Sequence, residues 1–353
     1  MTREPDSLVG RVLCDTYQLS RLLVSGGMAT VFAARHLRTG GVCAVKVLSE
    51  EATNNLEIYE RFQDEARISC SLRHPNIVQV MDLDQMEDGT PFLVMELLEG
   101  EDLHDRLHRR GRLPIGDALR LAREVGSALH TAHCRDVVHR DLKPQNIFLA
   151  RVEIDGQLRE TAKVLDFGLS KIRRPAARAT RDQLVLGTPR YLAPEAALGQ
   201  NSQLDGRADQ FSLAVILYRA LSGRLPFDAE EVVEILRQVV YAQPPPLSEL
   251  APEVPAHVRA AIERAMCKDK EDRFAAMLDF IEALEGLGAA PTMMTGAHAA
   301  TAAPAEAPAP QAEADGRAPS VALTGILPVP EALGEAAAAP HGAGRGFTEA
   351  PTF

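Results

Sequence analysis

The chain has 353 residues, enough for roughly two units of domain size, and 46% of them are hydrophobic, so a sizeable core is available. Its 49 acidic residues exceed its 38 basic ones, which argues against a general nucleic-acid binder, because such proteins need a basic face. The N-terminal stretch is polar and no apolar run reaches about 18 residues, so neither a signal peptide nor a membrane span is expected. Five scattered cysteines without a CxxC pair are typical of reduced thiols, and we expect a cytoplasmic protein.

The first part of the chain, residues 17–98, is predicted to consist mostly of strands. Residues 1–16 are treated as a short N-terminal extension. One helix is predicted from the apolar spacing of Leu56–Leu72. Short β-rich runs between glycine turns predict strands at Tyr17–Leu23, Ala29–His36, Val42–Leu48, Val78–Leu83 and Pro91–Leu97.

Residues 99–287 are predicted to be mostly helical. A hairpin is expected around Asp155-Gly156, with strands at Ile147–Ile154 and Leu158–Leu165. Apolar spacing of three to four residues predicts helices at Leu103–Arg110, Ile115–Ala132, Ala208–Leu221, Ala229–Val240, Pro255–Cys267 and Ala275–Leu284. The predicted fold class is therefore α+β, with a small β-rich lobe joined to a larger helical lobe near residues 97–100. A cleft between two lobes is a common place for a small-molecule site.

Composition changes near residue 288. From there to residue 353 the chain is rich in Ala, Pro and Gly, and its hydrophobic periodicity disappears. Such a segment cannot build a core, so a disordered tail is predicted at 288–353.

Three short stretches contain residues suited to chemistry. The stretch HRDLKPQN at residues 139–146 presents an acid, a lysine and an amide on one loop, which can hold a hydroxyl and a metal side by side. The stretch DFG at residues 166–168 follows a strand, and its carboxylate suits a divalent cation bound through oxygen. The stretch AVK at residues 44–46 fixes the ammonium of Lys46 on a rigid strand.

These stretches, followed by APE at residues 193–195, form an ordered series that resembles the eukaryotic-type Ser/Thr protein kinases, in particular the bacterial members. The resemblance covers residues 17–287. It implies a bilobal protein-kinase-like fold, with an N-lobe at 17–98 containing one main helix and a C-lobe at 99–287. It also implies transfer of the γ-phosphate of ATP to Ser or Thr hydroxyls of proteins.

The resemblance assigns roles around the phosphates. Lys46 is expected to hold the α and β phosphates of ATP, and Glu65 to fix its ammonium. Asp141 is expected to orient the substrate hydroxyl or accept its proton, with Lys143 near the transferred group. This division suits phosphoryl transfer, which depends on positioning and charge neutralisation.

The resemblance also assigns a metal site and an adenine site. Asn146 and Asp166 are the expected ligands of Mg²⁺, for which Mn²⁺ is an alternative. The expected adenine and ribose contacts are Val31 and Ala44 on the ring faces, Met95 at the back, the backbone of Glu96 and Leu98, and Asp102 on the ribose.

The glycine loop departs from the family pattern G-x-G-x-x-G. It reads Val24-Ser25-Gly26-Gly27-Met28-Ala29, so only the middle glycine is kept, with a second one beside it. A β-branched residue at position 24 favours extended backbone and limits the approach of the backbone to phosphate. Weaker ATP binding is therefore expected, and a pseudokinase or scaffold function remains an alternative.

Substrate class and regulation follow from a few further residues. Lys143 and Thr188 match the Ser/Thr class, and the Thr188 hydroxyl is expected to reach the catalytic loop. Thr180 lies in an arginine-rich stretch, and Arg140 precedes Asp141, so phosphorylation of Thr180 is expected to order this segment. The alternatives are that these arginines keep the loop soluble or attract acidic substrates, or that Asp182 supplies a fixed negative charge.

Structural roles and partners complete the expectations. Glu195 and Arg273 are expected to form a buried ion pair, and Asp209 is a further family-like position. The expected partners are protein substrates with Ser or Thr residues, and a second copy of the chain during autophosphorylation. Neither nucleic acid nor membrane is expected as a partner.

Overall fold

The computed structural model describes residues 5–154, 156–167 and 189–287. By its contacts the chain divides into two compact units, residues 1–292 and 293–353, and all described residues belong to the first. The expected tail at 288–353 and the two threonines Thr180 and Thr188 lie outside the described residues.

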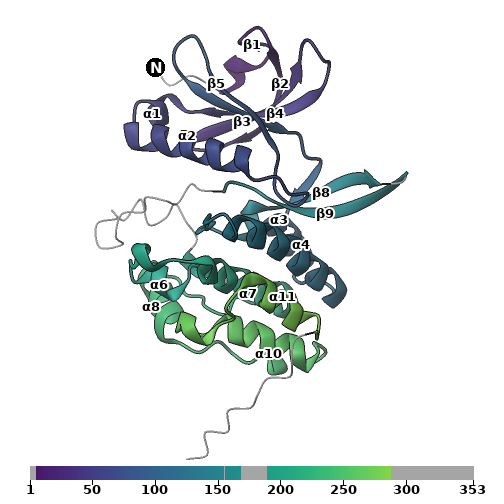
Figure 1. Cartoon of the computed structure of the whole chain (residues 1–353), viewed down its shortest axis with the longest axis vertical. Coiled ribbons are helices and arrows are strands. Elements are labelled where there is room, and N and C mark those ends of the chain that lie inside the picture. The colour runs from purple at the N-terminus through teal and green to yellow at the C-terminus, as the bar shows by residue number, and fades with distance from the viewer. Residues whose placement is uncertain (1–4, 155, 168–188, 288–353) are drawn as a thin grey trace, which may run out of the picture. The chain divides into compact units, whose positions relative to one another are not determined.

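The small lobe is built on one antiparallel sheet of six strands, in the order β1-β2-β3-β4-β6-β5 (Figure 1). Its strands are β1 (Val12–Leu13), β2 (Tyr17–Ser25), β3 (Ala29–His36), β4 (Val42–Leu48), β5 (Val80–Gln85) and β6 (Pro91–Glu96). Two helices belong to the same lobe, α1 (Glu50–Thr53) and α2 (Leu56–Ser71).

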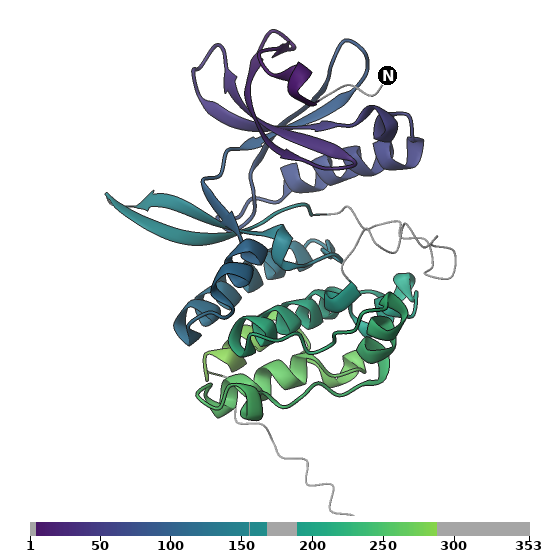
Figure 2. The same cartoon turned by 180° about the vertical axis from the view of Figure 1, so that it is seen from behind.

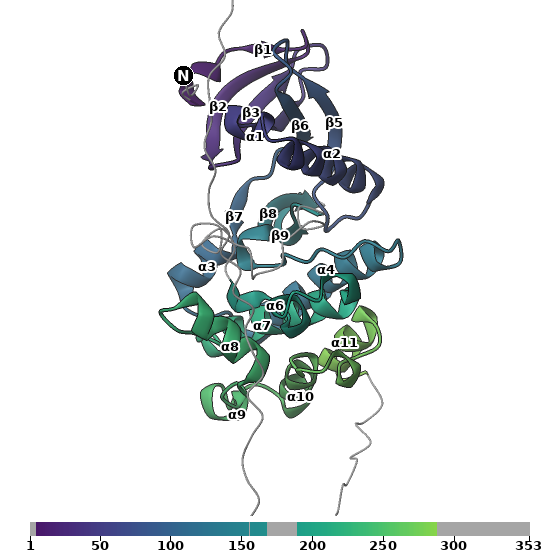
Figure 3. The ribbon, with the colours of Figure 1, turned by 90° about the vertical axis from the view of Figure 1, so that its left-hand side faces the viewer.

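The two faces of this sheet carry different apolar clusters. Val45 and Val47 of β4 pack into one cluster together with Phe32 and Phe92. Leu48 belongs to the other cluster, which includes Phe62 and Ala66 of α2. Successive side chains of a strand point to opposite faces, so Lys46, between the two valines, shares the face of Leu48 and α2. Figures 1 and 3 show α2 between the sheet and the large lobe.

The segment before residue 17 is part of this packing. The short strand β1 pairs with β2, with Leu13 opposite Tyr17. Leu8, which ends the 3₁₀ helix η1 (Pro5–Leu8), and Leu13 are both buried in the cluster of Phe32. Residues 1–16 were expected to form an extension, but Leu8 and Leu13 contribute to the core of the small lobe.

The large lobe is helical and is organised around one buried helix. That helix, α7 (Gly206–Ser222), is buried along most of its length and contacts α4, α10 and α11. Its N-cap is Asp205, and Gly223 in the left-handed conformation ends it. The other helices are α3 (Leu103–Arg110), α4 (Ile115–His133), α6 (Pro194–Ala197), α8 (Val232–Tyr241), α9 (Leu247–Leu250), α10 (Ala256–Ala265) and α11 (Met277–Leu284). Short 3₁₀ helices are η2 (Pro144–Asn146), η4 (Pro189–Tyr191), η5 (Asn201–Gln203) and η6 (Lys270–Asp272).

A second sheet of three strands belongs to the large lobe. Its order is β7-β8-β9, with β7 (Gly100–Asp102), β8 (Ile147–Ile154) and β9 (Gln157–Val164). The β8–β9 hairpin extends outward past the helices, as Figures 1 and 2 show from opposite sides. Gly100 makes the start of this sheet possible, because a Cβ at this position would lie 2.0 Å from the carbonyl oxygen of Leu149.

The predicted elements agree with the structure in kind and differ at their ends. Helix α8 begins at Val232 instead of Ala229, and α10 ends at Ala265 instead of Cys267. Strands β1 and β7 and the four-residue helices α1, α6 and α9 were not predicted, because they are too short to show a period. Among the described residues, no helix combines the length and apolar character needed to cross a membrane.

Candidate active site

Lys46 connects the two lobes at the inner face of the small-lobe sheet. Its Nζ lies 3.2 Å from Oε1 of Glu65 and 2.8 Å from Oδ1 of Asp166. Only 13% of the Lys46 side chain is exposed, so this ammonium is not the surface charge of an ordinary ion pair. The three residues come from β4, α2 and the segment after β9, and 120 positions separate Lys46 from Asp166.

Glu65 is held in place by the packing of α2. Phe62, Glu65, Ala66 and Ser69 are all buried, and their spacing of three and four positions places them on one side of the helix. Asn55 caps the first turn by accepting the N–H groups of Glu57 and Ile58. A carboxylate on this buried side therefore faces the sheet, where Lys46 is its partner.

The pKa values of the three groups show which charges dominate. Burial alone would lower the pKa of Lys46, but the carboxylates of Asp166 and Glu65 outweigh it and raise that pKa. Burial raises the pKa of Glu65 to about 8 despite the opposing effect of Lys46. The pKa of Asp166 falls, because Lys46 outweighs its burial. One ammonium thus faces two carboxyl groups, and the raised pKa of Glu65 shows that it does not keep both ionised; an added cation would favour the ionised form of the second.

The loop at residues 139–146 is fixed by a buried aspartate of helix α7. The carboxylate of Asp209, fully buried, accepts the backbone N–H groups of His139 and Arg140, each at 2.8 Å. Nε2 of His133 lies 2.7 Å from the same carboxylate. Arg140 has a φ of 65°, a conformation that costs a non-glycine residue about 1–3 kcal/mol unless its surroundings enforce it. The two hydrogen bonds to Asp209 supply that enforcement.

His133 is a site-supporting residue that the sequence analysis missed. It is the last residue of α4 and packs against Gly206, where a Cβ would lie 2.6 Å from its ring. The signal in the sequence is a histidine at the end of an otherwise apolar face, eight positions before Asp141. That signal alone could not have identified Asp209 as its partner, because α7 lies more than 70 positions away.

Asp141, Lys143 and Asn146 lie together on this loop. Lys143 Nζ lies 2.8 Å from Oδ2 of Asp141. Asn146 is buried, and its Nδ2 donates to the carbonyl oxygen of Asp141 at 2.9 Å, so its side-chain oxygen points the other way. The backbone N–H of Leu165 donates to the carbonyl oxygen of Asn146. This last bond ties the loop to the segment that carries Asp166.

The oxygens of Asn146 and Asp166 fit a hard divalent cation. Among the described residues, no group of three or more His, Cys, Asp or Glu side chains could enclose a metal by itself. Mg²⁺ does not require one, since it usually takes one or two protein oxygens and completes its shell with water and phosphate. The donor set therefore suits a metal that arrives with a nucleotide.

The chain belongs to the protein kinase domain family. Its sequence matches that family over residues 17–281. It is 40% identical over 280 residues to the serine/threonine-protein kinase Pkn1 of Myxococcus xanthus, and 38% identical over 285 residues to PknA of Mycobacterium tuberculosis. These matches cover 79% and 80% of this chain, and 39% and 63% of the two relatives. The chain thus spans less than two thirds of the length of these relatives.

Solved structures agree with this assignment. The kinase domain of Mycobacterium tuberculosis PknI superimposes with a TM-score of 0.61 at 28% sequence identity. The match covers 79% of this chain and 99% of that domain. The fold predicted from the motifs, with a β-rich N-lobe and a helical C-lobe, is confirmed, and so is the resemblance to bacterial Ser/Thr kinases.

The expected glycine loop of this kinase domain is the turn between β2 and β3. Val24 pairs with Val31 directly after an irregularity in the β2–β3 register, and 62% of its side chain is exposed. Gly27 has open space where a Cβ would lie, and Gly26 donates its N–H to the carbonyl oxygen of Ala29. The remaining residues of the loop, Ser25, Met28 and Ala29, complete the turn and the start of β3.

The residues expected around adenine lie along β3, β4 and β6. Val31 and Ala44 are on neighbouring strands, and Met95 pairs with Ala44. Leu98 follows β6 and is half-buried. Asp102 caps helix α3, because its Oδ1 accepts the N–H of Asp105 at 2.9 Å. One oxygen of this carboxylate is therefore engaged by the helix, and a contact of Asp102 with a ribose stays a prediction.

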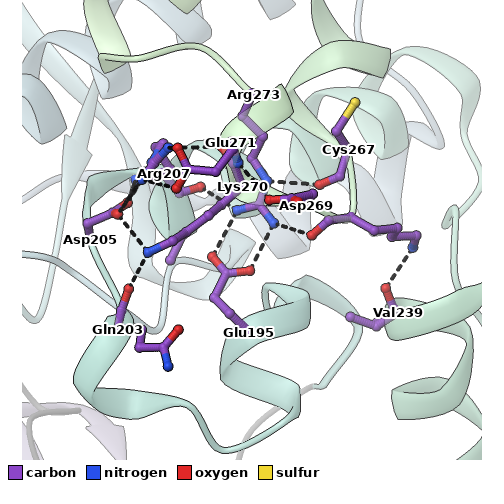
Figure 4. Close-up of polar contacts among 12 residues, drawn as sticks. Glu195, Gln203, Asp205, Arg207, Val239, Cys267, Asp269, Lys270, Glu271 and Arg273 are labelled. Atoms are coloured by element: carbon purple, nitrogen blue, oxygen red, sulfur yellow. Dashed lines mark hydrogen bonds and ion pairs between the residues drawn. The ribbon is translucent and has the colours of Figure 1, made fainter.

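The expected pair between Glu195 and Arg273 is present. Nη1 and Nη2 of Arg273 lie 2.9 and 2.8 Å from the two carboxylate oxygens of Glu195 (Figure 4). The guanidinium also donates to the carbonyl oxygens of Cys267, Arg207 and Lys268. This pair anchors α6 to the segment before α11, and so holds the end of the segment that begins at Asp166.

Proposed function

We propose that this domain transfers the γ-phosphate of ATP to Ser or Thr hydroxyls of proteins, with Mg²⁺ as cofactor and Mn²⁺ as a substitute. The observation that carries the proposal is the contact of Lys46 with both Glu65 and Asp166. It joins β4, α2 and the end of β9 at one point, beside the loop of Asp141 and Asn146. A scaffold that only needed the fold would not need this complete set of charges.

The residues of the chain would divide the work as follows. Lys46 binds phosphate oxygens, and its ammonium is oriented by Glu65. Asp141 orients the attacking hydroxyl and takes its proton, while Lys143, 2.8 Å away, neutralises charge near the transferred group. A Mg²⁺ ion held by Asn146 and Asp166 would neutralise charge on the phosphates.

Transfer of labelled phosphate from ATP to the chain itself and to a generic protein substrate tests this proposal. We expect incorporation with Mg²⁺ in the wild type, and its loss in Lys46→Met and Asp141→Asn. Lys270→Met is the matched control, because Lys270 pairs with Asp205 in the large lobe, outside the site. Nucleotide binding without any transfer would contradict the proposal and favour the scaffold alternative.

The scaffold alternative rested on Val24. This side chain is mostly exposed and Val24 pairs with Val31, which supports a loop that is open to solvent on the side of Val24. Outside the glycine loop, Lys46, Glu65, Asp141, Asn146 and Asp166 are all present, which supports active transfer as the better proposal.

We further propose that phosphorylation of Thr180 regulates this activity, through transfer between two copies of the chain. The support is Arg140, whose Nε is buried and meets no acceptor among the described residues. A phosphate carries about −1.5 to −2 charges and could satisfy such a group. We expect phosphatase-treated wild type to show a lag with ATP that Thr180→Ala lacks. Equal activity without a lag in both proteins would exclude this form of regulation.

A further inference from the structure

A charged pair outside the expected catalytic set joins the two lobes behind the connecting segment. Nζ of Lys163 lies 2.7 Å from Oε1 of Glu96, with 12% of the Lys163 side chain and 29% of the Glu96 side chain exposed. Lys163 lies on β9 in the large lobe, three positions before Asp166. Glu96 is the last residue of β6 in the small lobe, where the chain enters the segment that leads to β7.

The carboxylate of Glu96 is held by two donors. Besides Lys163, the backbone N–H of Gln79 donates to the same Oε1 at 2.8 Å. The N–H of Glu96 in turn donates to the carbonyl oxygen of Gln79 at 3.0 Å. The end of β6 is therefore tied to its neighbour in the small-lobe sheet and, through Lys163, to the large lobe.

The strand that carries Lys163 is itself firmly anchored. Val164 exchanges backbone hydrogen bonds with Asn76 and Val78, at 2.8 and 3.0 Å. The side chain of Asn76 donates to the carbonyl oxygen of Ala162 at 2.8 Å. Because its neighbours Ala162 and Val164 are held by these hydrogen bonds, the backbone of Lys163 is fixed in position.

We propose that Lys163 is a positioning residue for the nucleotide, which sets the connecting segment at a defined distance from Asp166. This inference rests on the proposed function, in which the backbone after Glu96 contacts adenine and Asp166 binds the metal at the phosphates. Removal of the ammonium leaves a half-buried carboxylate with one backbone donor, so the end of β6 moves toward water to solvate it. The adenine end of the site then moves relative to the phosphate end.

The test compares Lys163→Met with a control variant, Glu160→Gln, in a second ion pair of the same strand. Glu160 of β9 pairs with Arg106 of α3, and the exposures of that pair, 29% and 11%, nearly equal those of Glu96 and Lys163. Glu160→Gln therefore removes a charge contact of similar burial that stays inside the large lobe. Three quantities are measured for each variant: the Kd of Mg-ATP by calorimetry, KM and kcat, and hydrogen exchange of the backbone at residues 93–99.

We expect Lys163→Met to raise the Kd and KM for ATP about tenfold, less than the roughly 10²-fold that a 1 Å misplacement of reacting groups can cost. Because the groups around the hydroxyl are untouched, kcat should change far less. Exchange at 93–99 should become faster even without nucleotide. Lys163→Arg should keep the Kd, the kinetic constants and the exchange rate close to those of the wild type. Glu160→Gln should lower only the melting temperature.

Several outcomes would overturn the inference. If Lys163→Met and Glu160→Gln lowered the melting temperature alike and left nucleotide affinity and exchange unchanged, the pair would be structural only. If Lys163→Met did not fold, the nearly isosteric Glu96→Gln should show the same loss of affinity, and normal affinity would refute the proposal.

The proposed function can fail separately. A wild type that binds Mg-ATP without transferring phosphate would refute the proposed activity, while the Kd comparison would still decide the role of Lys163. If the wild type bound no nucleotide, both the proposed activity and the role of Lys163 in positioning a nucleotide would be refuted.

Discussion

Two groups of buried charges in this domain are built in opposite ways. Around Arg273, the five N–H groups of the guanidinium all have acceptors, and the carboxylate of Glu195 balances its charge. Around Lys46, a single ammonium is shared between Glu65 and Asp166, and the pKa of Glu65 is raised to about 8. One cluster is complete within the protein, and the other lacks the positive charge needed to keep both of its carboxyl groups ionised.

This difference separates an architectural role from a chemical one. Breaking a complete buried pair lowers the free energy of unfolding, since the loss of one partner leaves a buried charge without its counter-charge. An incomplete cluster can take up a cation, because the cation supplies the positive charge needed to ionise its second carboxyl group. Substitutions in the first cluster should therefore act on stability, and substitutions in the second on activity.

The largest expected effect is on activity at the incomplete cluster and its neighbouring loop. Lys46→Met and Asp141→Asn should each lower phosphoryl transfer by at least about 10²-fold, because a positioned acid–base or charge-stabilising group contributes that much. Initial rates with labelled ATP measure the loss, and circular dichroism checks the fold. Full activity in Asp141→Asn would show that another group handles the hydroxyl proton.

The largest expected effect on stability is at the complete cluster. Glu195→Gln should lower the free energy of unfolding by about 3–5 kcal/mol, the usual result of stranding one partner of a buried pair. The control is Glu253→Gln, since Glu253 pairs with Arg112 at exposures of 49% and 58% and should cost about 0–1 kcal/mol. Urea unfolding measures both. A similar small loss of stability in the two variants would show that the buried pair is no more important for stability than the exposed pair.

Acid should weaken the polar network next to the complete cluster. Burial would raise the pKa of Asp205, but hydrogen bonds from Arg207 and Lys270 outweigh it and lower this pKa to about 2. Because the folded pKa lies below the unfolded value, Asp205 stabilises the fold above about pH 4, and this contribution disappears as the pH falls through 2.

Since 41% of the Asp205 side chain is exposed, we expect no more than about 1 kcal/mol from this residue. The free energies of unfolding of wild type and Asp205→Asn should therefore differ at pH 7 and converge near pH 2. A constant difference at both pH values would show that the N-cap of α7, and not the charge, is responsible.

The smallest expected effect is at the glycine loop. Val24→Gly should lower the KM for ATP by less than about fivefold, since the backbone freedom of glycine corresponds to about 0.5–1 kcal/mol. The exposed side chain of Val24 explains why the change is small. Titration of ATP at saturating substrate measures it. A higher KM would show that the strand ladder with Val31 already places the loop correctly.

Part of this site could be predicted from local pattern. The alternation along β4 places Lys46 on the face opposite Val45 and Val47, and the helical spacing of Phe62, Glu65 and Ala66 places the glutamate on the buried side. These two facts require only the period of each element. The motifs at residues 139–146 and 166–168 were also recognisable, because each is a short, continuous stretch of sequence.

Other features could not be predicted in this way. Asp209 holds the loop at residues 139–146 through residues 69 and 70 positions away, and Lys163 reaches Glu96 across 67 positions. Neither partner is marked by a local period or turn. The packing of Leu8 and Leu13 was missed because β1 has two residues, too few to show alternation.

The sequence by itself determined the longer elements, the candidate site residues and the family that they match, since periodicity and motif spacing are properties of a continuous stretch. Only the tertiary structure decided which charges share a site and which are complete without a ligand. It brought Asp166 to Lys46 over 120 positions and gave Arg273 its five acceptors. The physical reason is that burial and charge balance depend on all neighbours in space, and most of those neighbours are distant in the chain.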